Sequence, residues 1–354
     1  MDKGDFNAAY KYLKKAKASV SGKVYDSDLL LIQIEIISNE CWINRCKGDY
    51  KKAIKNGELA LEKLKEVREK YRHLKELKSV QKIFDLEIEI KAGLGNTYVS
   101  KGEYTKAVQL LLEVLEYYKL KNDYAGLAGT YNSLGSGFNS LGENQKAEEF
   151  FLKSIDVSTK IGNRQGIART YGNLGTINYF RGNFKKALSM FKKENEIAEE
   201  IGNPKGILLS IVRLGALEFS LGKLNNAENY FLKGLNLAKK IGSQQDIGAF
   251  SSNLGSVYQR LRQFEKAAEF TSVFLDISKK TGDFWGEAAA LNNLAGIASE
   301  QGDYIKAEKM FNNALKLTRK LEEKNLLGQC LCSVSYTHLR AHETVLDLVC
   351  RLLL

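Results

Sequence analysis

The chain has 354 residues, of which 44% are hydrophobic and one is proline, and it carries a formal net charge of +11. No apolar segment follows a basic start, so no secretory signal peptide is expected, and residues 1–333 contain no apolar run long enough to span a membrane. Apolar residues recur with helical rather than alternating spacing, which predicts an all-α protein.

Residues 1–81 contain two weak copies of a pattern that becomes regular further along the chain. Gly4 is followed by Ala9, and Gly48 by Ala53, and each spacing predicts a turn that leads into a helix. Because the first copy starts at its turn, we expect an internal start codon or a lost first helix. Residues 61–81 carry apolar side chains at helical spacing, which predicts one overlong helix or a long helix with a kink.

Residues 82–333 contain six repeats of forty residues and the start of a seventh. Four columns of small or apolar residues recur in register. The columns are Leu94, Leu134, Leu174, Leu214, Leu254 and Leu294; Gly95, Gly135, Gly175, Gly215, Gly255 and Ala295; Gly102, Gly142, Gly182, Gly222, Arg262 and Gly302; and Ala107, Ala147, Ala187, Ala227, Ala267 and Ala307. A fixed period of this size predicts a solenoid in which each repeat packs on its neighbours.

Each repeat reads as two helices joined by a short turn. In residues 126–161, apolar residues at spacings of three, four and seven predict one helix before Gly142 and a second one after it. Gly142 suits the left-handed position that ends a helix, and Gly135 and Ala147 are small because two helices pass close together there. Asn163 is expected to cap the next helix, and Pro204 falls in the first turn of another.

Residues 334–354 break the repeat and match a translated sequencing adapter. The transposase mosaic end and the read-two adapter translate to the segment from Val334 to Thr344, and the terminal adapter translates to the segment from Asp347 to Leu354. We therefore interpret Ser333 as the last natural residue of an open fragment. His338 and His342 have the spacing of a metal pair on a helix, but this interpretation assigns both to the adapter.

The Leu-Gly pair, the turn Gly with a following aromatic residue, and the Ala five residues after the turn Gly resemble the tetratricopeptide repeat over residues 82–333. The forty-residue period is similar to that of LGN/Rapsyn-type and Rap-type scaffolds and of bacterial sensor proteins. The resemblance implies a right-handed α-solenoid whose first helices line a concave groove that binds a peptide or a protein segment. Carried over by position, the groove residues are Asn96, Asn132, Ser136, Asn139, Arg169, Thr176, Tyr179, Ser252, Ser256, Gln259 and Asn292.

Two departures from the family pattern bear on the partner. Carboxylate-clamp members carry Asn directly after Leu-Gly, whereas only Asn96 does so here, and this disfavours recognition of a chaperone tail. The fourth regular repeat is apolar at the groove positions, which predicts a hydrophobic contact there. Its residues are Leu209, Val212, Ala216 and Phe219.

No pattern in residues 1–333 predicts an active site, a cofactor site or a metal site. His73, the one histidine outside the adapter segment, lies in a helix rich in Lys and Glu and reads as a surface residue. The cysteines lack the paired spacing of a zinc site and are expected to be reduced thiols of a cytoplasmic protein. Glycines near residues 93 and 135 lie inside predicted helices and not after a strand, so they do not form a dinucleotide fingerprint.

These features favour a non-catalytic module that binds a peptide or protein segment, as the N-terminal sensor or scaffold part of a longer bacterial signalling protein. One alternative is the regulatory portion of a signalling enzyme, such as a histidine kinase or cyclase, or of a transcription regulator. A nucleic-acid-binding scaffold is disfavoured, because the lysines are spread over every second helix and interleaved with Glu.

Overall fold

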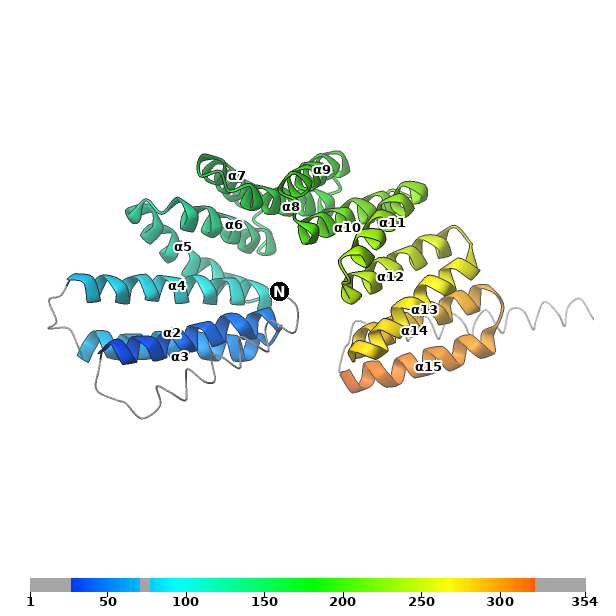
Figure 1. Cartoon of the computed structure of the whole chain (residues 1–354), viewed down its shortest axis with the longest axis horizontal. Helices are drawn as coiled ribbons and strands as arrows, with labels where there is room; N and C mark the ends of the chain where they lie inside the picture. The colour runs from blue at the N-terminus through cyan, green and yellow to red at the C-terminus, as the bar shows by residue number, and fades with distance from the viewer. Residues whose placement is uncertain (1–26, 71–76, 322–354) are drawn as a thin grey trace, which may run out of the picture. The chain divides into compact units, whose positions relative to one another are not determined.

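The computed structural model describes residues 27–70 and 77–321, and these residues form helices joined by short turns (Figure 1). The helices are α2 (Ser27–Cys46), α3 (Tyr50–Lys70), α4 (Leu77–Lys101), α5 (Tyr104–Lys121), α6 (Tyr124–Ser140), α7 (Asn144–Lys160), α8 (Arg164–Phe180), α9 (Phe184–Ile201), α10 (Pro204–Ser220), α11 (Leu224–Lys240), α12 (Gln244–Arg260), α13 (Phe264–Thr281), α14 (Phe284–Glu300) and α15 (Tyr304–Leu321). The predicted all-α solenoid of helix pairs is confirmed. His73, residues 1–26 and the adapter-like segment lie outside the described residues.

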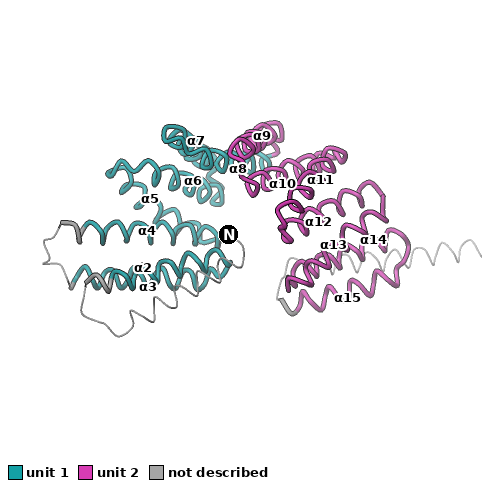
Figure 2. Tube along the Cα trace, viewed as in Figure 1, with its two compact units in different colours: residues 1–181 teal, residues 182–354 magenta. Residues whose placement is uncertain are grey.

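The chain divides into two compact units, residues 1–181 and residues 182–354 (Figure 2). In the first unit, α6 packs on α7 and α4 on α5, and the first helices α4, α6 and α8 also contact one another in sequence. In the second unit, α10 packs on α11, α12 on α13 and α14 on α15, and α12 contacts both α10 and α14. Even-numbered helices are therefore the first helices of the repeats, and odd-numbered helices are the second helices.

The core of each helix pair is built from the predicted columns. All six Ala residues of the Ala column have fully buried side chains, and the six Leu residues of the Leu column are buried as well. Gly135 faces Phe151 so closely that a Cβ on Gly135 would lie 2.8 Å from Cδ1 of that ring. Gly215 meets Phe231 in the same way, at 2.4 Å from Cε1. These glycines are therefore small because a large side chain of the paired helix occupies the space.

Helix ends follow the sequence pattern. Gly142 has φ +80°, and its N–H donates to the carbonyl of Asn139 while the next N–H donates to the carbonyl of Phe138. This pair of bonds satisfies two carbonyls that the helix end leaves free. The Asn163 side chain accepts from the Gly166 N–H at 2.9 Å at the start of α8, and Pro204 lies in the first turn of α10, as predicted.

The stretch between the turn glycines Gly48 and Gly102 is longer than a regular repeat, and its extra residues are divided between two helices. The helix α3 has 21 residues and α4 has 25, whereas α6, α7 and α8 have 17 each. A single overlong or kinked helix through residues 61–81 is wrong, because α3 and α4 pack against each other and Arg68 on α3 pairs with Glu87 on α4. Residues 71–76 lie outside the described residues.

Candidate functional site

The sequence-predicted groove residues all lie on first helices, on one recurring side. Seven of them belong to the first unit and four to the second. They are Asn96 on α4; Asn132, Ser136 and Asn139 on α6; Arg169, Thr176 and Tyr179 on α8; Ser252, Ser256 and Gln259 on α12; and Asn292 on α14. Arg169 is exposed and the other ten are half-buried. In each unit separately, we call the surface formed by these residues and by the equivalent positions of neighbouring first helices the first-helix face of that unit.

In the first unit, the structure joins α6 and α8 through an amide cluster. The Asn132 Oδ1 atom accepts from Asn173 Nδ2 at 3.0 Å and from the Thr170 hydroxyl at 3.3 Å. The single Thr170 proton is shared between this oxygen and the carbonyl of Gly166, which is the nearer acceptor at 2.9 Å. Asn132 therefore links adjacent repeats, and its side chain is half-buried.

The hydroxyl groups of the face have a common orientation. Ser136 donates to the Asn132 carbonyl at 3.2 Å, Thr176 to the Gly172 carbonyl at 2.9 Å, and Ser256 to the Ser252 carbonyl at 3.2 Å. Each proton is used within its own helix, so each oxygen is left to act as an acceptor. Together with the amides, these oxygens provide both kinds of partner that a peptide backbone needs.

In the second unit, α12 and α14 are joined in the same manner. The Gln259 amide donates to Oε1 of Glu300 at 3.0 Å across the two first helices. The Asn292 Oδ1 atom is buried and has no hydrogen-bond partner within the described part of the chain. This carbonyl is an acceptor that the described fold leaves unused.

A second recurring column of the first-helix face was missed by the sequence reasoning. It lies one residue after the Asn132 column and contains Asn173, Arg213, Asn253 and Asn293, all half-buried. The forty-residue period was the signal that could have found it, because equivalent positions stack in adjacent repeats. Arg213 differs from the others because its guanidinium pairs with the buried carboxylate of Glu194 on α9.

An aromatic pair of one half-buried and one exposed ring ends α8. The rings of Tyr179 and Phe180 meet edge to face, with centroids 5.4 Å apart, and Phe180 is 80% exposed. Exposed aromatic rings of this size are contact candidates because they remain apolar surface in water.

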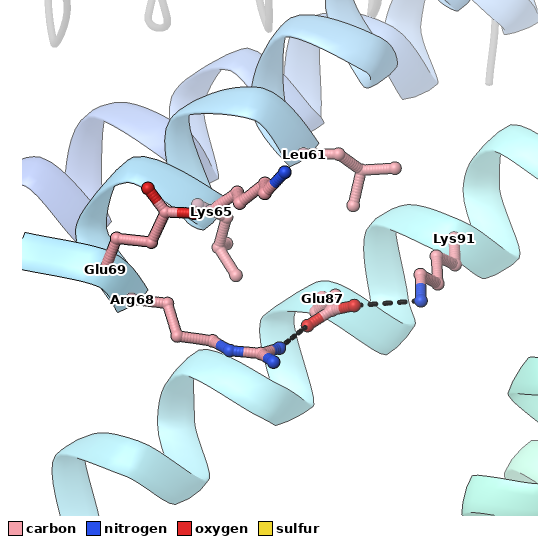
Figure 3. Close-up of a pocket in the computed structure, with 7 residues that line it drawn as sticks. Leu61, Lys65, Arg68, Glu69, Glu87 and Lys91 are labelled. Atoms are coloured by element: carbon pink, nitrogen blue, oxygen red, sulfur yellow. Dashed lines mark hydrogen bonds and ion pairs between the residues drawn. The ribbon is translucent and has the colours of Figure 1, made fainter. Parts of the chain in front are cut away.

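A cavity of about 480 Å³ lies between α3 and α4, away from the predicted residues (Figure 3). Glu87 on α4 accepts from Arg68 at 3.3 Å and from Lys91 at 2.8 Å, and Lys91 also donates to Glu113 on α5 at 2.9 Å. Partial burial lowers the pKa of Lys91, but its bonds to the two carboxylates outweigh this and raise it. These ion pairs connect three helices, so we interpret the charged residues of the cavity wall as a structural link between α3, α4 and α5.

The described residues hold no group of three or more His, Cys, Asp or Glu side chains arranged to bind a metal ion. Cys41 is a buried free thiol whose pKa is raised by burial, and Cys46 is an exposed free thiol. Across the described ranges, no helix is both long and apolar enough to cross a membrane.

Comparison with known families agrees with the repeat geometry. The MalT-like TPR region family matches residues 163–324, the tetratricopeptide repeat family matches residues 92–123, and the PPR repeat family matches residues 129–156. The chain therefore contains tetratricopeptide repeats over residues 92–123 and 163–324. Such arrays are protein-interaction scaffolds and are generally non-catalytic.

Solved structures share the fold of this tetratricopeptide repeat protein at low sequence identity. One is the apo form of the quorum sensor NprR from B. thuringiensis, with a TM-score of 0.64, 15% identity and coverage of 89% of this chain and 83% of that one. Another is aspartyl phosphate phosphatase F from Bacillus subtilis, with a TM-score of 0.59, 14% identity and coverage of 88% and 83%.

A third similar structure is a signal transduction ATPase with numerous domains from Pyrococcus horikoshii, which carries a tetratricopeptide repeat sensor. Its TM-score is 0.60 at 20% identity, and the match covers 91% of this chain and 54% of that one. No curated protein matches the tetratricopeptide repeat chain in sequence. At these identities the likeness concerns the fold alone.

Proposed function

We propose that the first-helix face binds an extended peptide or a segment of a partner protein. The observation that carries this proposal is that successive first helices present hydroxyl oxygens with unused acceptor capacity next to half-buried side-chain amides. Ser136, Thr176 and Ser256 keep only acceptor capacity, while side-chain amides such as that of Asn173 supply donors as well. A peptide backbone offers one N–H and one C=O per residue and matches such a surface along its length.

We further propose that this binding serves signalling and that the chain is the sensor or scaffold part of a longer bacterial protein, such as a regulated kinase, cyclase or transcription regulator. The similar ATPase from Pyrococcus horikoshii supports this, because it carries its repeats as a sensor and this chain spans 54% of it. A cytoplasmic location fits the free thiols of Cys41 and Cys46, since a reducing compartment keeps thiols unpaired.

An array of immobilised twelve-residue peptides of varied sequence, probed with the fluorescently labelled full chain, tests the binding proposal. Ser256→Arg places a long side chain on the half-buried face of α12 and is expected to remove most array signals from the second unit. Ser136→Arg does the same in the first unit. The matched control is Ser189→Arg, because Ser189 is exposed on the second helix α9.

The proposal fails if no peptide binds the chain, or if the control abolishes binding as strongly as the two face variants while all three melt like the parent chain. Salt dependence separates the nucleic-acid alternative. A scaffold for nucleic acid loses affinity steeply as salt rises, in proportion to the phosphates it contacts, and it would bind oligonucleotides in place of peptides.

A further inference from the structure

The first-helix face of α10 differs from those of α12 and α14 in the same unit. We call four of its residues the α10 patch: Leu209, Val212, Ala216 and Phe219. Leu209 is 50% exposed and Ala216 is exposed, while Val212 and Phe219 are half-buried and pack on the hydrophobic core of the second unit. The equivalent positions of α12 carry Ala249, Ser252, Ser256 and Gln259. The patch is therefore an apolar strip beside polar first helices.

Two guanidinium groups accompany the α10 patch. The Arg260 guanidinium on α12 lies over the Phe219 ring at 5.5 Å from its centroid, and Arg260 is an exposed residue. Arg213 follows Leu209 by four residues and precedes Ala216 by three, so these side chains project from one side of α10. The patch thus has one cation at the edge shared with α12 and another on its own helix.

An ion pair with a buried residue of α9 holds the Arg213 side chain in place. It pairs with Glu194 on α9, which is only 3% exposed, and the second carboxylate oxygen of Glu194 is buried without a hydrogen-bond partner in the described ranges. The Arg213 side chain itself remains 22% exposed. A planar guanidinium fixed on one side keeps its remaining N–H donors in a defined direction.

The charge of Arg213 is already paired with Glu194, whereas the described residues give the exposed Arg260 guanidinium no carboxylate partner. Among the stacked positions of α10, α12 and α14 that form the face, the acidic residue is Glu300, and its carboxylate already accepts from Gln259. A ligand seated between Arg213 and Arg260 therefore meets positive charge together with apolar surface. The complementary chemistry is a carboxylate next to bulky apolar side chains.

We propose that the α10 patch binds a peptide segment in which an Asp or Glu side chain stands beside bulky apolar residues, with Arg260 as the residue that determines specificity for the acid. This inference rests on the proposed function and specifies which segment that function selects. A second copy of this chain is disfavoured as the occupant because each copy carries a net charge of +11. Phosphate-rich ligands satisfy the two arginines but leave the apolar strip in water.

The test uses the full chain and nine-residue fluorescein-labelled peptides that are blocked at both ends. The peptides share Leu and Phe flanks and differ in one central residue, which is Glu, Gln or Lys. Anisotropy titrations are expected to give about ten-fold tighter binding for the Glu peptide than for the Gln peptide, because a charge-assisted bond to guanidinium is lost in the Gln peptide. The Lys peptide is expected to bind most weakly.

Variants of the chain locate the contact. Arg260→Gln is expected to remove the preference for Glu over Gln, and Leu209→Ser is expected to weaken all three peptides by about three-fold or more through lost apolar contact. The matched control is Arg319→Gln, since Arg319 is exposed on the second helix α15 and its loss changes the net charge equally. We avoid replacing Arg213, because this would leave Glu194 buried without its partner.

Three outcomes overturn the proposal. Equal binding of the Glu and Lys peptides, with binding still blocked by Ser256→Arg, leaves peptide recognition intact and removes the acidic specificity. Equal losses in Arg260→Gln and Arg319→Gln show an effect of overall charge and not of contact. Absence of binding by all three peptides also overturns it, and the immobilised array then decides separately whether the proposed function survives.

Discussion

The first helices α8 and α10 have the same length and the same buried Leu-Gly pair but different surfaces. Both have 17 residues, and each buries its Leu-Gly pair, Leu174-Gly175 in one and Leu214-Gly215 in the other. On the first-helix face, α8 carries Arg169, Gly172, Asn173, Thr176 and Tyr179, where α10 carries Leu209, Val212, Arg213, Ala216 and Phe219. None of these five positions is conserved between the two helices, although the helix pairs fold alike.

This difference separates two kinds of constraint. A core position such as Gly215 meets the Phe231 ring at contact distance, so a change there requires its neighbour to move. A face position borders solvent, so it can vary without disturbing the helix pair. The repeats therefore hold the fold constant in the core columns and carry their differences, including any specificity, in the face columns.

The largest expected effect comes from replacing one buried aromatic side chain in each unit by Ala, which tests whether the two cores contribute equally to stability. Phe151→Ala and Phe231→Ala are each expected to lower the free energy of unfolding by about 3–5 kcal/mol, because each ring is buried against a glycine of its paired helix. Urea unfolding followed by circular dichroism measures both. Phe180→Ala is the control, since that ring is 80% exposed, and it is expected to cost less than about 1 kcal/mol. A near-zero cost at either buried ring contradicts the comparison.

The core columns and the caps could be predicted from the sequence because they depend on local geometry that recurs every forty residues. The helix pairs, the buried Leu and Ala columns and the capping Asn163 all follow from spacing. The division of the long N-terminal stretch into α3 and α4 did not, since apolar residues at helical spacing continue through residues 61–81 and give no stop signal.

The face could be predicted in part. The family pattern names the first helices and one side of each as the binding surface, and this assignment stays a prediction. The Asn132–Asn173 bond joins residues 41 apart and could have been found from the period, but the pairing of Arg213 with Glu194 could not. Glu194 stands where three other repeats carry the small residues Ser154, Gly234 and Ala314, and only the packed structure shows what that carboxylate meets.

Glu194 gives the second unit a pH dependence that the first unit lacks at the equivalent Ser154. Burial raises the pKa of Glu194 to about 7, against a smaller lowering by Arg213. The folded chain thus keeps this proton to higher pH than the unfolded chain does. Stability from this group therefore falls as pH rises from about 4.5 to about 7, and the loss is complete above that range.

Glu194→Gln removes this titration. Relative to the parent chain, the variant is expected to gain roughly 1–3 kcal/mol as pH rises from 5 to 8, which unfolding curves at several pH values measure. Asp156→Asn is the control, because Asp156 is exposed and pairs with Lys160 on the surface of α7. A variant whose stability falls relative to the parent over this range would show that the Arg213 pair outweighs burial.

The link between adjacent repeats can be compared at one column of the face. Asn132→Ala is expected to cost about 1 kcal/mol, because the amide of Asn173 loses its acceptor while Thr170 keeps the Gly166 carbonyl. Ser252→Ala, at the equivalent position of α12, is expected to change stability by less than about 0.5 kcal/mol, as is usual for such sites. Equal costs at the two positions would mean that the cluster does not couple α6 to α8.

The turn columns give the smallest expected effects. Arg262 has φ +58° where other turns carry Gly, and its guanidinium lies over the Phe264 ring at 5.3 Å from the centroid. Arg262→Gly relieves the strain of a side-chain-bearing residue in the left-handed region, which stabilises the folded chain. It also removes the contact with the ring and gives the unfolded chain more conformational freedom, and both effects destabilise. The free energy of unfolding is therefore expected to stay within about 0.5 kcal/mol of the parent value. Gly222→Arg, at φ +72° with Leu224 in place of the aromatic ring, is expected to lose about 1 kcal/mol. Thermal melting of both variants checks this, and equal losses would show that the ring beside Arg262 does not stabilise it.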